Sequence, residues 1–348
     1  TLQANTTGAS NTAVGHQTLY ANTTASNNTA VGMNALVANT TGTRNTAIGA
    51  YAADAITDGL ANVLVGNNAG GGGNFSTGVA VGDNALLANT GNNNTALGQA
   101  AMAANTSGSE NTAVGQGALD ANTTASSNTA VGKDALGANT TGPNNSAVGE
   151  GALYTNTTGS ENIAVGRLAM YYNQSGEDNV AVGYAALYEN TTADNNTAVG
   201  FKSLFSNTTG TANVAVGAFA LDANTTASNN TALGYLSLTA NTTGAQNTAV
   251  GRSALAAITT GSHNTAVGYA ALDAEDTGGA SVAVGPWALS SQNYDGNAYN
   301  TAVGYLAGED VTTGVKNTLI GGLAGDAITT GERNVYLGYT TGTSATDV

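Results

Sequence analysis

The stretch that decides the fold is Asn145-Ser146-Ala147-Val148-Gly149, one version of a pentapeptide whose commonest form is N-T-A-V-G. Twenty versions follow one another along the chain, nearly always 17 residues apart, with two intervals of 16 and one of 19. They begin at residues 11, 28, 45, 62, 78, 94, 111, 128, 145, 162, 179, 196, 213, 230, 247, 264, 281, 300, 317 and 334. A short fixed period over a whole chain indicates a solenoid, in which each repeat buries its apolar face only against its neighbours.

We number each repeat, or coil, from the first residue of its pentapeptide, and the coil that begins at residue 145 is called coil 145. Positions 1 to 5 predict a short strand, because β-branched residues alternate with small ones. Positions 2 and 4, Thr12 and Val14 in the first coil, are predicted to face the core. Position 3 is Ala in 17 of 20 coils and is predicted to face outward, against a close neighbour. Position 5 is Gly in all 20, which predicts a positive φ or a contact without room for a Cβ.

The second half of each coil predicts a second strand at positions 8 and 9, usually Ala-Leu, whose Leu closes the core. Position 12 is usually Asn, but it becomes Ile56 where position 9 is Ala53, and Val311 where position 9 is Gly308. This exchange of volume indicates that position 12 also points inward. An inward amide in each coil can pair with the amides above and below, so the sequence predicts a buried ladder. Its members are Asn22, Asn39, Asn122, Asn139, Asn156, Asn190, Asn207, Asn224 and Asn241. Many of them also start N-x-[ST] sequons, but an inward asparagine cannot carry a glycan, so the ladder is the favoured interpretation.

The predicted fold is an all-β parallel β-solenoid of about 20 coils with two short strands per coil. We expect one continuous solenoid over residues 1–348, with a partial first coil at 1–10, twenty repeats over 11–338 and a terminal half-coil at 339–348. Coils about 4.8 Å apart would make a thin rod on the order of 95 Å long. Residues 67–77 contain four consecutive glycines and lack the Leu, which predicts a loosened corner. Neither end has an evident cap, so we expect a fragment of a longer protein or subunits that stack end to end.

The repeat N-[TVI]-A-[VIL]-G, including Ser281-Val282-Ala283-Val284-Gly285, resembles the head repeats of YadA-like trimeric autotransporter adhesins and similar repeats in phage tail fibres and surface-fibre proteins. The resemblance covers residues 11–338. It implies a left-handed parallel β-roll, three chains side by side, a cell-surface location and adhesion to matrix or host surfaces.

Composition excludes several classes of function. Only 7 basic residues accompany 22 acidic ones, for a net charge of -15, so no basic patch exists for nucleic acid. No apolar run approaches the roughly 20 residues of a membrane helix. His16 and His263 lie far apart, and the carboxylates at position 10, such as Asp54 and Asp120, rarely occur in adjacent coils. With no nucleophile elbow, phosphate-binding loop or zinc spacing, the sequence predicts no catalytic, cofactor or metal site and no enzyme activity.

Aromatic residues form the one other regular pattern. Tyr154, Tyr171, Tyr188 and Phe205 occupy position 10 of four consecutive coils and are predicted to stack on the outside. The stack either stabilises the solenoid, which we favour, or forms a contact strip for a glycan or a protein. Further aromatic residues recur at position 6: Tyr184, Phe201, Tyr235, Tyr269 and Tyr305.

These patterns predict an extracellular, non-enzymatic repeat protein that forms the rigid rod of a cell-surface fibre or filament. Self-association is expected, either laterally through the Ala face or end to end. The alternative is an adhesin head that binds host, matrix or glycan surfaces as a trimer. Ice binding is a third hypothesis, weakened because the regular Thr at position 2 is predicted to be buried.

Overall fold

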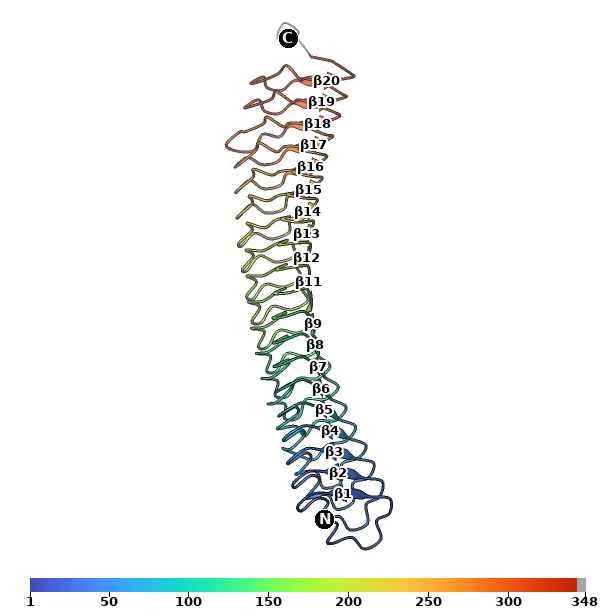
Figure 1. The fold of residues 1–348 in the computed structure, drawn as a ribbon. Helices are drawn as coiled ribbons and strands as arrows, with labels where there is room; N and C mark the ends of the chain where they lie inside the picture. The colour runs from blue at the N-terminus through green and yellow to red at the C-terminus, as the bar shows by residue number, and fades with distance from the viewer. Residues whose placement is uncertain (343–348) are drawn as a thin grey trace. The chain divides into compact units, whose positions relative to one another are not determined.

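The computed structural model describes residues 1–342 and is an all-β parallel β-solenoid of about 20 coils of about 17 residues, as predicted (Figure 1). Residues 343–348, the end of the expected terminal half-coil, lie outside the described residues. The chain divides into two compact units, one over residues 1–175 and one from residue 176 onward, and each is described by itself. Within residues 1–342 there is no helix with the length and apolar character that crossing a membrane requires.

One three-residue strand occurs in each coil, at positions 2 to 4. In the first unit these are β1 (Thr12–Val14), β2 (Thr29–Val31), β3 (Thr46–Ile48), β4 (Val63–Val65), β5 (Val79–Val81), β6 (Thr95–Leu97), β7 (Thr112–Val114), β8 (Thr129–Val131), β9 (Ser146–Val148) and β10 (Ile163–Val165). In the second unit they are β11 (Val180–Val182), β12 (Thr197–Val199), β13 (Val214–Val216), β14 (Thr231–Leu233), β15 (Thr248–Val250), β16 (Thr265–Val267), β17 (Val282–Val284), β18 (Thr301–Val303), β19 (Thr318–Ile320) and β20 (Val335–Leu337).

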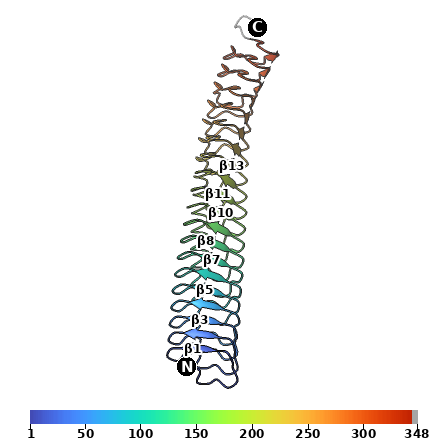
Figure 2. The ribbon, with the colours of Figure 1, turned by 45° about the vertical axis from the view of Figure 1, so that its right-hand side comes forward.

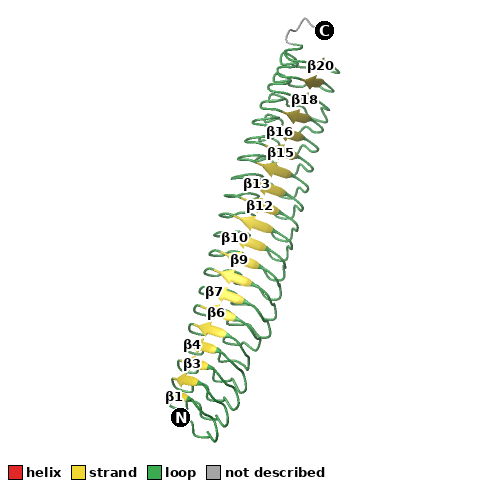
Figure 3. Ribbon diagram, turned by 90° about the vertical axis from the view of Figure 1, so that its right-hand side faces the viewer, coloured by secondary structure: helices red, strands yellow, loops and turns green. Residues whose placement is uncertain are grey.

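Strands of successive coils pair in parallel, residue on equivalent residue. In the first unit, for example, Ala130 of β8 lies beside Ala147 of β9, which lies beside Ala164 of β10. The same register relates β14 to β15 in the second unit. Figure 2 shows the strands of the first unit lying one above another, and Figure 3 shows that each yellow strand is followed by a long green loop. The pentapeptide therefore sets the register, because each copy pairs with the next copy.

The second side of the coil, where positions 8 and 9 predict a second short strand, is also hydrogen-bonded from coil to coil. The amide of Leu36 donates to the Ala52 carbonyl of the next coil at 3.0 Å, and the amide of Asn34 donates to the His16 carbonyl of the previous coil at 2.9 Å. Positions 7 and 9 both have positive φ, however, as in Asn34 at 58° and Leu36 at 50°. This side is therefore a run of turns rather than an extended strand, because a strand needs negative φ at every residue and here every second residue has a positive φ.

The prediction of which strand residues face the core was wrong. Position 3 is buried in every coil except those of β1 and β20, whereas positions 2 and 4 are half-buried or exposed; Val14, for example, is 58% exposed. Side chains alternate along a strand, so once the small alanine points inward the β-branched residues on both sides must point outward. The expected outward Ala face is consequently the inside of the coil and cannot be a surface for lateral association.

Glycine at position 5 satisfies both of the expected reasons for its presence. In Gly149 φ is 135°, and a Cβ added there would lie 2.5 Å from the carbonyl oxygen of Gly166 in the next coil. A side chain at this corner would prevent the coils from approaching closely enough to pair.

The predicted exchange of volume in the core is confirmed, and it extends to position 3. Ile56 and Val311, which replace asparagine at position 12, are fully buried. The large residues Leu64 and Leu319 at position 3 occur in coils whose position 9 is Gly70 or Gly325. A Cβ on either glycine would lie within 2.9 Å of the leucine side chain of its own coil. Positions 3 and 9 thus face each other across the core and share one fixed volume.

Residues 67–77 do not form a loosened corner. Phe75, only 2% exposed, and Leu64 together fill the space that the Leu at position 9 occupies in other coils. The core is continuous through this stretch of the first unit.

Candidate functional site

The predicted asparagine ladder is present at position 12, and all nine of its named members are fully buried. In the first unit the Asn139 side-chain amide donates to the Asn122 side-chain oxygen at 3.1 Å, and the Asn156 amide donates to the Asn139 oxygen at 2.8 Å. In the second unit Asn207, Asn224 and Asn241 each donate in the same way to the asparagine one coil earlier. Each amide also donates to the carbonyl at position 15 of its own coil, as Asn139 does to Gly142 at 3.0 Å. The side chains thus bond the coils together and hold each second corner.

The ladder ends where an isoleucine follows an asparagine. The side-chain oxygens of Asn39 and Asn241 are buried without a hydrogen-bond partner, and the next coils carry Ile56 and Ile258 at position 12. An unpaired buried amide oxygen costs about 1–3 kcal/mol. These two ends are therefore weak points within the stacks.

A second asparagine ladder, which the sequence interpretation missed, lies at position 1. The Asn28 side-chain oxygen accepts from the Asn45 backbone amide of the next coil at 3.0 Å, and the Asn28 side-chain amide donates to the Gly42 carbonyl at position 15 of its own coil at 2.9 Å. Position 1 faces inward because it lies two residues before the buried Ala at position 3. Asn at this position in 18 of 20 coils was the signal that could have revealed it.

One carboxylate occupies the ladder position in the second unit. Glu275, fully buried at position 12, accepts from the Gly278 amide at 2.8 Å and from the Gln292 side-chain amide at 2.8 Å. Gln292 in turn accepts from the Asn300 side-chain amide at 2.8 Å. Burial raises the pKa of the Glu275 carboxyl, because a charged group loses its hydration there.

The predicted contact strip has two of its four residues in each unit. Tyr154 and Tyr171 of the first unit stack with ring centroids 5.2 Å apart and planes inclined by 18°. Tyr188 and Phe205 of the second unit stack with centroids 5.0 Å apart and planes inclined by 6°. All four residues are half-buried, so their rings pack on one another and remain partly open to solvent.

A longer aromatic row lies at positions 6 and 7 of the second unit. Tyr184 stacks on Phe201 at 5.3 Å, and the Arg252 guanidinium lies over the rings of both Tyr235 and Tyr269, at 5.8 and 5.7 Å. Trp287 meets Tyr269 edge to face at 4.9 Å. These rings pack on one another, yet each residue keeps more than a third of its surface exposed. The stabilising role favoured from the sequence stays a prediction.

The groups considered for metal binding do not gather. His16 and His263 are both exposed. Burial raises the pKa of the position 10 carboxyls Asp54 and Asp120, and neither belongs to a larger set of donors. Among residues 1–342 no group of three or more His, Asp or Glu side chains is placed to hold a metal ion.

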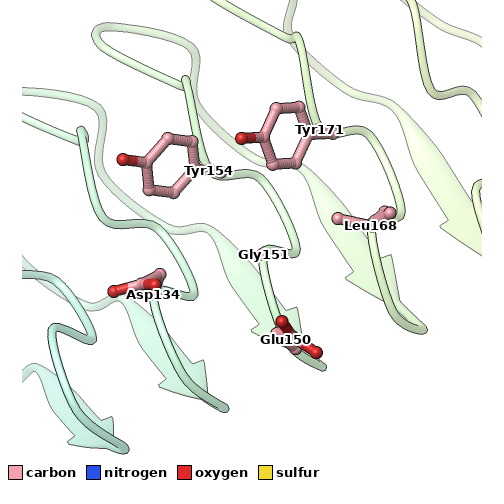
Figure 4. Close-up of a pocket in the computed structure, with 6 residues that line it drawn as sticks. All are labelled: Asp134, Glu150, Gly151, Tyr154, Leu168 and Tyr171. Atoms are coloured by element: carbon pink, nitrogen blue, oxygen red, sulfur yellow. The ribbon is translucent and has the colours of Figure 1, made fainter.

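The first unit has a surface hollow of about 210 Å³ beside the aromatic pair (Figure 4). In the figure the two tyrosine rings lie on one side and two carboxylates on the other, all from three successive coils. The lining residues are Asp134, Glu150, Gly151, Tyr154, Leu168 and Tyr171. Asp134 pairs with Lys133 at 3.0 Å and Glu150 pairs with Arg167 at 3.1 Å.

A search against models of protein families found no match, and no curated protein is significantly similar in sequence.

Proposed function

We propose that this protein is a non-enzymatic, extracellular structural protein that forms the rigid shaft of a cell-surface fibre or filament. The observation that carries the proposal is the pair of asparagine ladders, which repeat the same buried hydrogen bonds from coil to coil in each unit. A core of this kind can be lengthened or shortened by whole coils without any other change. The number of coils would then set the length of the shaft.

Lateral self-association belongs to the proposal, through a face other than the one first expected. Positions 2 and 4 of the strands form an outward face that holds Thr, Val, Ile, Leu and one Ser, and none of its residues is charged. Ile48 is 42% exposed and Leu97 is 48% exposed. Exposed aliphatic side chains that recur along one face of a protein indicate an interface. We assign this face to contact with further copies of the chain.

The length of the shaft can be tested by deleting whole coils. Removal of residues 94–161, which are four complete coils of the first unit, joins two equivalent positions. We expect particles about 19 Å shorter, four times the spacing of about 4.8 Å, when measured by negative-stain electron microscopy. Unchanged length, or globular particles, would contradict the proposal.

The association face can be tested with a charge. Val114→Lys places an ammonium group on the outward face, whereas Gln116→Lys adds the same charge at an exposed corner of the same coil. We expect the first variant to lower the mass measured in solution by light scattering and the second to leave it unchanged. Equal masses for wild type and both variants would remove this face from the proposal.

Ice binding gains support from the same face. Thr12, Thr29 and Thr46 at position 2 were expected to be buried, but the structure places them outward in a regular array. Regularly spaced hydroxyl and methyl groups on a β-solenoid are the arrangement that this hypothesis requires. Thermal hysteresis of the wild-type protein, lost in a variant with Thr29→Lys and Thr46→Lys, would favour ice binding over a purely structural shaft.

A further inference from the structure

The hollow of the first unit exists because one side chain is missing. Position 7 carries a side chain at positive φ in most coils, whereas coil 145 has Gly151 with a φ of 65°. Coil 111 also has a glycine there, Gly117, but a Cβ on it would lie 2.5 Å from the Asp134 carboxylate, so the Asp134 side chain occupies that space. A Cβ there would already lie 3.1 Å from the Leu168 side chain and 3.3 Å from the Tyr171 ring. Any larger side chain would fill the space.

Two kinds of surface meet in the hollow. The aromatic wall is made by Tyr154 and Tyr171, whose nearly parallel rings are half-buried. The Tyr154 ring also packs closely against Gly137 of the preceding coil, since a Cβ on that glycine would lie 3.0 Å from the ring. The opposite wall is made by the carboxylates of Asp134 and Glu150.

The charge of the hollow is balanced, although the chain as a whole is strongly acidic. Lys133 contacts one oxygen of Asp134, and Arg167 contacts one oxygen of Glu150. Two of the chain's 7 basic residues therefore form ion pairs with the two acidic residues of this site. The pairing reduces the attraction for a free cation and leaves each carboxylate a second oxygen that can accept hydrogen bonds.

We propose that this hollow binds one pyranose ring of a neutral glycan. A sugar ring has an apolar C–H face, which packs on tyrosine, and hydroxyl groups, which donate to carboxylates. A volume of about 210 Å³ lies below the usual size of pockets for larger ligands, so one ring is the unit that it accommodates. The inference extends the adhesin alternative to a defined site and does not depend on the shaft.

The test uses saturation-transfer NMR on the full chain with methyl glycosides of glucose, galactose and mannose. A single exposed subsite of this size binds with a dissociation constant on the order of 1 mM. Gly151→Asn restores the side chain that other coils carry and should weaken binding at least about tenfold. Ser253→Asn, at position 7 of a coil in the second unit with a φ of 57°, is the matched control and should bind as the wild type does.

A second variant keeps the test independent of folding. Glu150 is exposed, so Glu150→Gln leaves the fold intact, because an exposed ion pair contributes little stability. We expect it to weaken binding about fivefold, as the loss of a charged acceptor does. No transfer to any of the three glycosides, or equal transfer in wild type and both variants, would overturn the proposal. Stronger binding of n-butylamine than of every glycoside would show a cation site instead and would also overturn it. Shaft length is unaffected by either substitution, so failure here is distinguishable from failure of the shaft.

Discussion

Coil 145 and coil 62 of the first unit fill the same core volume from opposite sides. Coil 145 pairs a small Ala147 with a large Leu153, and both are fully buried. Coil 62 pairs a large Leu64 with Gly70, and Phe75 fills the rest. The backbone is the same strand followed by turns in both coils. The solenoid therefore fixes the core volume of each coil and leaves the distribution of that volume between positions 3 and 9 open.

The largest expected effect comes from moving the pattern of coil 62 into coil 145. Leu153→Gly alone should destabilise the protein by about 3–4 kcal/mol through the cavity, and Ala147→Leu alone by about 2 kcal/mol through overpacking. The double variant should lose at least about 2 kcal/mol less than the sum of the two. Denaturant unfolding of the four proteins measures this coupling.

The control for that double-mutant cycle is a second cycle, which combines Ala147→Leu with Leu119→Gly. Leu119 lies two coils away from Ala147. Those two changes share no core volume, so their costs should add within about 0.5 kcal/mol. Equal coupling in both cycles would refute the pairing of positions 3 and 9.

The ladder gives the next effect, because Asn139 of coil 128, just before coil 145, lies within an unbroken stack, whereas Asn39 of coil 28 lies at a ladder end. Asn139→Ala removes a donor from Asn122 and Gly142 and an acceptor from Asn156. Asn39→Ala removes only the donor to Asn22 and Gly42, because its own oxygen has no partner. We expect losses of about 3 and about 2 kcal/mol, measured by thermal unfolding. A larger loss for Asn39→Ala would show that the hydrogen bonds do not govern the difference.

An increase in stability is expected for a substitution in coil 247, which combines features of both coil types. Coil 247 keeps Leu255 at position 9 and also carries Ile258 at position 12, so it has the large residue of a regular coil without its asparagine. Ile258→Asn should supply a hydrogen-bond donor to the Asn241 side-chain oxygen, which has no partner, and should stabilise the protein by up to about 1 kcal/mol. Ile56→Asn, in a coil with Ala53 at position 9, should instead destabilise it. A loss of equal size in both variants would contradict this explanation.

The smallest expected effect on stability concerns Glu275, whose carboxyl group stands where other coils have the ladder amide at position 12. The pKa of Glu275 is raised by burial, so the folded state holds its proton more tightly than the unfolded state does. Its contribution to stability is therefore largest at acidic pH and declines as the pH rises from about the ordinary value of 4.5 through the raised pKa. Glu275→Gln should remove this decline, which unfolding midpoints measured between pH 4 and 7 would show as a flatter profile. An unchanged slope would mean that other carboxyls, such as Asp222 and Asp273, carry the pH dependence.

The sequence by itself determined the repeat, the register of the strands, the glycine corner and the ladder at position 12. All of these depend on equivalent positions meeting one coil apart, and a fixed period makes them visible in a single chain. The proposed function, its location and the resemblance to adhesin heads remain predictions.

Only the tertiary structure decided which face of the strand turns inward. Alternation alone allows either choice, and hydrophobicity favours burying Thr12 and Val14, yet the narrow coil accepts only the small Ala opposite Leu. The substitutions at Leu64 and Gly70 contained that answer, but their meaning needs the two positions to be known as neighbours. The hollow at Gly151 likewise arises from three successive coils, which no single repeat reveals.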